Sequence, residues 1–136
     1  MTLTIDTFAW VEFLSAGRFG PRVLRHFEQS GHLLTPDVVL AEIARKSAKE
    51  GMSHPAIAGH LESVIALSSV AAITPTIALE VSRADSDLRR SAAQRRLGSP
   101  SFTDAIILAT ARVTGSKVLT GDRHFEGFPE TEWLLA

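Results

Sequence analysis

The stretch SFTDAIILATARVTGSKVLTGD, residues 101–122, predicts a helix followed by a strand. Ser101 and Asp104 form the S-x-x-D pattern of a helix cap, and Gly115 is a typical residue at a helix end. The short apolar run KVLT that follows is typical of a buried strand, and the turn after it carries Asp122. One carboxylate therefore stands at the start of the helix, and another follows the end of the strand.

Similar strand signals recur along the chain and alternate with helical patterns. Strands are expected at LTID (3–6), HLLTP (32–36), VAAIT (70–74), KVLT (117–120) and TEWLL (131–135). Strands joined through helices form a parallel sheet, because a parallel connection needs a long crossover. We therefore expect one α/β domain over residues 1–136, with a central parallel sheet of four to five strands and helices on both faces.

The composition excludes several kinds of site. The 136 residues are 45% hydrophobic, enough for a single core, and contain no cysteine, which excludes disulfides and thiolate chemistry. The net charge of −1 excludes a global attraction to nucleic acid, so any contact with RNA must use a local basic patch. No signal peptide or apolar run of about 20 residues is visible, so we expect a cytoplasmic protein without a membrane partner.

Two further acids accompany Asp104 and Asp122 at the expected ends of strands. Asp6 ends the first strand, and Glu42 lies in the helix after the second. The carboxyl ends of parallel strands form the binding crevice of such sheets, so all four side chains are candidates for one site.

Each of these acids also has an ordinary structural explanation. Asp6 and Asp104 suit helix caps, and Asp122 suits a turn that contains glycine. Glu42 could form an ion pair with Lys46, one helical turn later. For any single acid taken alone we favour the structural explanation, because such uses are common.

The four acids together favour a cation site. Glu42 and Asp104 lie within apolar sequence, where an unpaired charge is costly. Carboxylates that converge also repel one another and raise each other's pKa. One or two Mg²⁺ or Mn²⁺ ions would relieve both costs, because these ions prefer oxygen ligands.

Four segments carry a resemblance to a known family. They are TIDTFAW, LAEI, SFTDAIILATAR and VLTGDRHFEGFP, and their order and spacing match over the whole chain. At these residues the sequence resembles the PIN-domain ribonucleases, and most closely the VapC-like toxins of type II toxin–antitoxin pairs.

The resemblance implies a metal-dependent endoribonuclease of single-stranded or loop RNA. Its metal ligands would be Asp6, Glu42, Asp104 and Asp122, holding Mg²⁺ or Mn²⁺. A metal-activated water would attack the phosphodiester, and the products would carry a 5′-phosphate and a 3′-hydroxyl. Thr7 and Thr120 match hydroxyl positions that would orient a water or a carboxylate. An antitoxin that covers the active-site groove and a homodimer are further implied partners.

One position departs from the family pattern. Many relatives carry another acid two residues after the position of Asp122, where this chain has His124. The loss of that charge would weaken a second ion. For the imidazole itself we expect an ordinary surface role.

A cluster of arginines is a candidate for RNA binding. Arg89, Arg90, Arg95 and Arg96 could bind phosphates bidentately. A solvated helix with pairs such as Asp85–Arg89 is the better-supported explanation for most of them.

Two other functions compete with the nuclease. A PIN fold without catalysis could bind RNA or a protein partner as a scaffold, and His124 keeps this alternative open. A phosphoacceptor receiver domain is disfavoured, because TID has only one acid, AAIT lacks a final Asp, and Lys117 precedes its strand.

Overall fold

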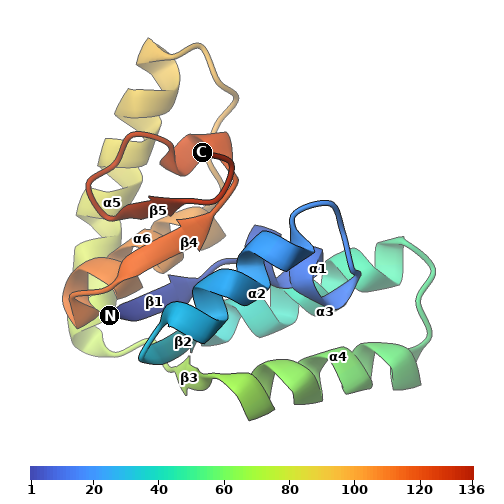
Figure 1. Ribbon diagram of the computed structural model, residues 1–136. Helices are drawn as coiled ribbons and strands as arrows, with labels where there is room; N and C mark the ends of the chain where they lie inside the picture. The colour runs from blue at the N-terminus through green and yellow to red at the C-terminus, as the bar shows by residue number, and fades with distance from the viewer.

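The computed structural model describes residues 1–136 and contains one sheet of five parallel strands. Their spatial order is β3-β2-β1-β4-β5, so β1 lies at the centre (Figure 1). The strands are β1 (Thr2–Ile5), β2 (His32–Pro36), β3 (Ser69–Ala71), β4 (Lys117–Thr120) and β5 (Thr131–Trp133). The expected α/β architecture is confirmed, and all five expected strands form.

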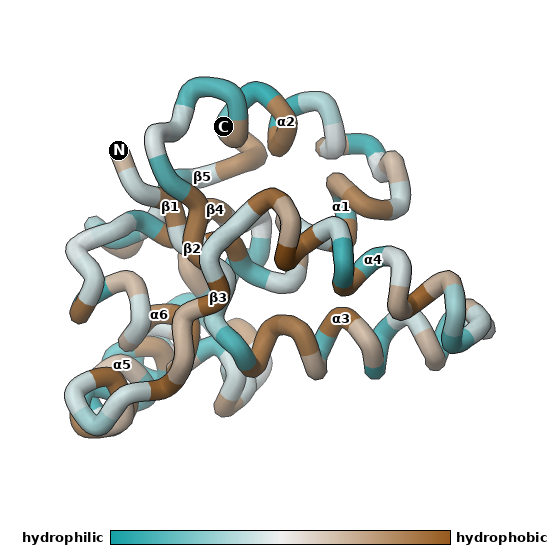
Figure 2. The backbone as a smooth tube through the Cα atoms, turned by 90° about the horizontal axis from the view of Figure 1, so that it is seen from below, coloured by the Kyte–Doolittle hydropathy of each residue, from teal (hydrophilic) through white to brown (hydrophobic).

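Six α-helices connect and cover the strands. They are α1 (Thr7–Leu14), α2 (Gly20–Gln29), α3 (Asp37–Lys49), α4 (His54–Leu67), α5 (Pro75–Gln94) and α6 (Phe102–Thr114), followed by the short 3₁₀ helix η1 (Arg123–Phe125). Helices α1 and α2 lie on one side of the sheet, and α5 and α6 lie on the other (Figure 2). Helices α3 and α4 form an antiparallel pair that extends away from the sheet (Figure 1).

Helix α6 explains the apolar run in residues 101–122. Seven consecutive residues, Ala105 to Ala111, are buried, because α6 packs against β1, β2 and β4 on one side and against α5 on the other. Full burial of a side chain such as Leu108 contributes about 1.5–3 kcal/mol. The helix start is consequently held rigidly against the sheet.

The register of the central strands brings the acids to one edge. Ile5 at the end of β1 pairs with Leu119 in β4, and Thr4 pairs with Leu34 in β2. Asp6 follows Ile5 directly, and Asp122 follows Leu119 by three residues. The same edge therefore receives side chains from distant parts of the sequence.

Thr35 and Pro36 are residue types that also suit the start of a helix. Both belong to β2, however, and α3 has no side-chain cap. The Thr35 hydroxyl instead accepts a hydrogen bond from Nε1 of the buried Trp10 at 3.0 Å, which ties α1 to β2. Leu24 is exposed on α2, although its side chain is apolar.

No helix is long and apolar enough to cross a membrane.

Candidate functional site

Asp6 joins the end of β1 to the start of α1. Its Oδ1 atom accepts a hydrogen bond from the Ala9 backbone N–H at 2.9 Å, so the expected helix cap is confirmed. The side chain is nevertheless buried, and this desolvation raises the pKa of Asp6 to about 7, against the opposing hydrogen bond from the Thr120 hydroxyl. A cap at the helix surface would not need this burial.

Asp104 is held by a capping box at the start of α6. The Ser101 backbone N–H donates to Oδ2 of Asp104 at 3.0 Å, while the Ser101 hydroxyl accepts from the Asp104 N–H at 3.1 Å. Burial raises the pKa of the Asp104 carboxyl, and the hydrogen bonds from Ser101 only partly oppose this. The cap and the candidate site thus share one carboxylate.

Asp122 is held by the turn after β4. Its backbone N–H donates to the Thr120 hydroxyl at 2.9 Å, and its Oδ1 accepts the His124 N–H at 2.9 Å. Gly121 lets the Phe8 ring pack against this turn, because a Cβ atom at Gly121 would lie 2.5 Å from Phe8 Cε1. Close packing fixes the direction of the carboxylate.

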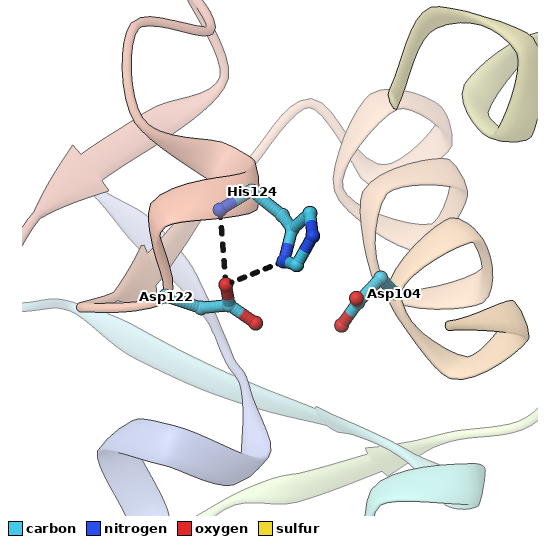
Figure 3. Close-up of side chains that lie close together, drawn as sticks. All are labelled: Asp104, Asp122 and His124. Atoms are coloured by element: carbon cyan, nitrogen blue, oxygen red, sulfur yellow. Dashed lines mark hydrogen bonds and ion pairs between the residues drawn. The ribbon is translucent and has the colours of Figure 1, made fainter. Parts of the chain in front are cut away.

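His124 lies inside the site, so the expectation of an ordinary surface role is wrong. Its Nδ1 atom lies 3.0 Å from Oδ1 of Asp122, and its Nε2 atom lies 2.7 Å from the Gly98 carbonyl oxygen. Burial lowers the pKa of His124, but the Gly98 carbonyl and the Asp122 carboxylate outweigh it and raise the pKa. Ligand atoms of Asp104, Asp122 and His124 lie within 4.8 Å of one another (Figure 3).

Glu42 reaches the same region from α3. Its side chain is only 13% exposed and pairs with Arg45 at 3.8 Å, one turn along the helix. The half-buried position expected for Glu42 is therefore confirmed. The predicted pair with Lys46 is replaced by this pair with Arg45.

All four acids line one hollow of about 450 Å³ at the carboxyl edge of the sheet. Its lining residues are Asp6, Thr7, Phe8, Glu42, Arg45, Lys46, Ser99, Ser101, Asp104, Ile107, Asp122 and His124. Thr120 is fully buried beneath the acids, where it contacts Asp6 and Asp122. The sequence therefore identified the acidic wall of this hollow, although the residues lie far apart in the chain.

The donor set suits a hard divalent cation. Four carboxylates supply oxygen ligands, and burial leaves two of them with raised pKa values that a cation would offset. The buried Oγ1 of Thr7 has no hydrogen-bond partner in the protein, although such groups are rarely unsatisfied. A hydrated ion beside Thr7 would satisfy it.

Arg45 and Lys46 also line the hollow, and neither was predicted as a site residue. Both lie on α3, one turn after Glu42, and a helical turn places such residues on one side. That spacing was the available signal.

None of the four arginines proposed for RNA binding lines the hollow. Arg89 pairs with Asp85 at 3.0 Å, and Arg90 pairs with Asp87 at 3.7 Å. The remaining two differ: Arg95 donates to the carbonyl oxygens of Arg123 and Glu126 and pairs with the Glu126 carboxylate at 3.0 Å, while Arg96 is exposed. A role for them in RNA binding remains a prediction.

Comparison with known proteins identifies the architecture. The sequence model of the PIN domain matches residues 3–130. No curated protein has a significant sequence match to the chain.

Three solved structures are similar over nearly their whole length. A toxin–antitoxin complex from Klebsiella pneumoniae superposes with a TM-score of 0.70 at 18% identity, covering 97% of each chain. VapC20 of Mycobacterium tuberculosis, described as a toxin that cleaves the sarcin–ricin loop, has a TM-score of 0.69 at 21% identity, covering 95% of this chain and 98% of that one. VapBC-1 from nontypeable Haemophilus influenzae has a TM-score of 0.70 at 13% identity, covering 98% of this chain and 96% of that one. At these identities the likeness shows a common fold.

Proposed function

The chain belongs to the PIN-domain family, and on that premise we propose that it is an endoribonuclease that depends on Mg²⁺ or Mn²⁺ and acts as the toxin of a toxin–antitoxin pair. The observation that carries the proposal is the convergence of Asp6, Glu42, Asp104 and Asp122 around one hollow. Four separate structural roles would not require these carboxylates to share it. A common cation explains their convergence.

The four acids would approach the cation from different parts of the fold. Asp104 and Asp122 are the most closely grouped, Asp6 forms the buried base, and Glu42 approaches from α3. A bound Mg²⁺ or Mn²⁺ supplies a water of lowered pKa and polarises a phosphoryl oxygen. Thr120 holds the turn that carries Asp122, and the unpartnered Thr7 hydroxyl is positioned to orient a water.

The lining of the hollow also supplies positive charge for the substrate. Arg45 and Lys46 are exposed on α3, beside the acids. Arginine and lysine bind backbone phosphates, mainly through charge. We assign them to the RNA phosphates that flank the cleaved bond, which gives the hollow local positive charge in a chain whose net charge, with these two residues included, is −1.

The toxin role rests on the relatives and on an apolar surface. One of the similar structures is described as a toxin–antitoxin complex, from Klebsiella pneumoniae, and another as a toxin, from Mycobacterium tuberculosis. This chain has a hollow between α2 and α4 that is lined by Phe13, Leu24, Phe27 and Leu67, with Leu24 and Leu67 about half exposed. An antitoxin segment with apolar side chains would fit there. The homodimer and the cytoplasmic location remain predictions.

Incubation of the purified chain with end-labelled RNA tests the activity. We expect cleavage with Mn²⁺ or Mg²⁺, none with EDTA, and products with 5′-phosphate and 3′-hydroxyl ends. Cleavage in EDTA, or 2′,3′-cyclic phosphate ends, would contradict the metal-dependent mechanism. RNA binding without any cleavage would favour the scaffold alternative.

A further inference from the structure

His124 is held in one orientation by a contact on the far side of its ring. The Nε2 atom lies 2.7 Å from the carbonyl oxygen of Gly98, in the segment between α5 and α6. A carbonyl oxygen only accepts hydrogen bonds, so Nε2 must carry the proton. Nδ1 is then the nitrogen that either shares a proton with the Asp122 carboxylate or, in the neutral ring, offers its lone pair to a cation. Histidines that bind metals use this arrangement, in which a carbonyl fixes the nitrogen that does not bind.

The Nδ1 atom of His124 points into the acid cluster. Nδ1 lies 3.0 Å from Oδ1 of Asp122, and the Asp104 carboxylate lies on the other side of the gap (Figure 3). A separation of about 3 Å is also the distance between neighbouring ligands of a six-coordinate ion whose bonds are about 2.1 Å long. The separation of Nδ1 and Oδ1 thus suits a hydrogen bond between the two residues and equally suits two ligands of one ion.

We propose that Nδ1 of His124 is a ligand of the cation bound by Asp104 and Asp122, and that it biases this site toward Mn²⁺ over Mg²⁺. The proposal rests on the metal site of the proposed function and extends it. Mg²⁺ favours all-oxygen ligand sets, whereas imidazole suits transition metals and Mn²⁺ stands above Mg²⁺ in its tolerance of nitrogen. A site with His124 in place of a carboxylate therefore has one negative charge fewer and a greater preference for Mn²⁺ over Mg²⁺.

A competing explanation makes the opposite prediction. If His124 is a cation that donates an Nδ1–H bond to Asp122, it occupies the place of the metal and must leave before an ion binds. Removing the ring would then strengthen binding of Mn²⁺. If His124 is a ligand, removing it weakens binding.

Electron spin-echo spectroscopy of Mn²⁺ bound to the RNA-free protein separates these cases. We expect a ¹⁴N coupling from a directly bound imidazole in the parent chain and its loss in His124→Ala. We also expect the Kd for Mn²⁺ to rise about tenfold or more in that variant. His124→Asp should bind Mg²⁺ more tightly than His124→Ala does. Its ratio of Mn²⁺ to Mg²⁺ affinity should be lower than that of the parent chain. His54→Ala, at an exposed histidine in the first turn of α4, is the matched control and should change neither signal.

The outcomes also separate this inference from the proposed function. Bound Mn²⁺ without ¹⁴N coupling in the parent chain, or tighter Mn²⁺ binding in His124→Ala, would overturn the role of His124 and leave the carboxylate site intact. No Mn²⁺ binding by the folded parent chain would overturn both. Because the coupling is measured in the parent chain, the result does not depend on whether a variant folds.

Discussion

Replacement of Asp6 by Asn should stabilise the metal-free protein, even though Asp6 caps a helix. Asn keeps an oxygen that can accept the Ala9 N–H, so the cap is retained. What the substitution removes is a carboxylate that burial holds at a pKa of about 7, against 3.8 for the unperturbed group. The substitution therefore isolates the cost of keeping an acid in the hollow.

The pH dependence of this effect follows from proton binding. Between about pH 4 and pH 7 the native Asp6 keeps a proton that the unfolded chain has released, so the stability of the parent protein falls as pH rises through this range. Moving the pKa of one carboxyl from 3.8 to about 7 corresponds to about 4 kcal/mol once the group is ionised. Asp6→Asn should thus match the parent near pH 4 and exceed it by up to about 4 kcal/mol at pH 8.

Urea unfolding in EDTA, repeated between pH 4 and pH 8, measures this difference. Asp85→Asn is the control, because Asp85 pairs with Arg89 on the surface and contributes less than about 1 kcal/mol. Addition of Mn²⁺ should raise the Tm of the parent protein but not that of Asp6→Asn. A stability difference that does not change with pH, or a variant less stable at pH 8, would refute the reasoning.

Three further substitutions probe how the site is held in place. Gly121→Ala should slow RNA cleavage and lower the free energy of unfolding by about 1–3 kcal/mol, because the new Cβ collides with Phe8. Its control is Gly59→Ala, which has open space in α4 and should raise the free energy of unfolding in urea by about 0.5–1 kcal/mol. Ser101→Ala should cost about 1 kcal/mol and slow cleavage without abolishing Mn²⁺ binding, measured by titration; unchanged stability would contradict the capping box. Arg112→Gln should cost about 2–4 kcal/mol and leave Mn²⁺ affinity unchanged, because it removes the guanidinium shared by three carboxylates outside the hollow.

The local signals predicted the elements that hold the acids. The Ser101 and Asp104 pattern gave the start of α6 correctly, and Gly115 ends that helix in the left-handed conformation that favours glycine. The apolar runs gave β1 and β4, and parallel pairing then required Asp6 and Asp122 to reach the same edge. These features depend on neighbours in the chain and on a general rule of sheet geometry.

The features that the sequence did not reveal depend on contacts between distant segments. The Thr35 hydroxyl accepts a hydrogen bond from Trp10, 25 residues earlier, and nothing near Thr35 in the sequence indicates this partner. His124 acquires its place in the cluster from the carbonyl of Gly98, a contact that no local pattern encodes. Arg45 lines the hollow because the side of α3 that carries Glu42 faces α6 and the other acids.

The central claim is that the four acids form the metal centre of a ribonuclease, and Asp104→Asn tests it most directly. Asn keeps a side-chain oxygen for the capping box, so the fold should be retained, as circular dichroism would verify. The measurement is the single-turnover rate of RNA cleavage by parent and variant over a titration of Mn²⁺. We expect a rate that saturates with Mn²⁺ in the parent and no cleavage above background in Asp104→Asn. Equal rates in the two proteins would contradict it.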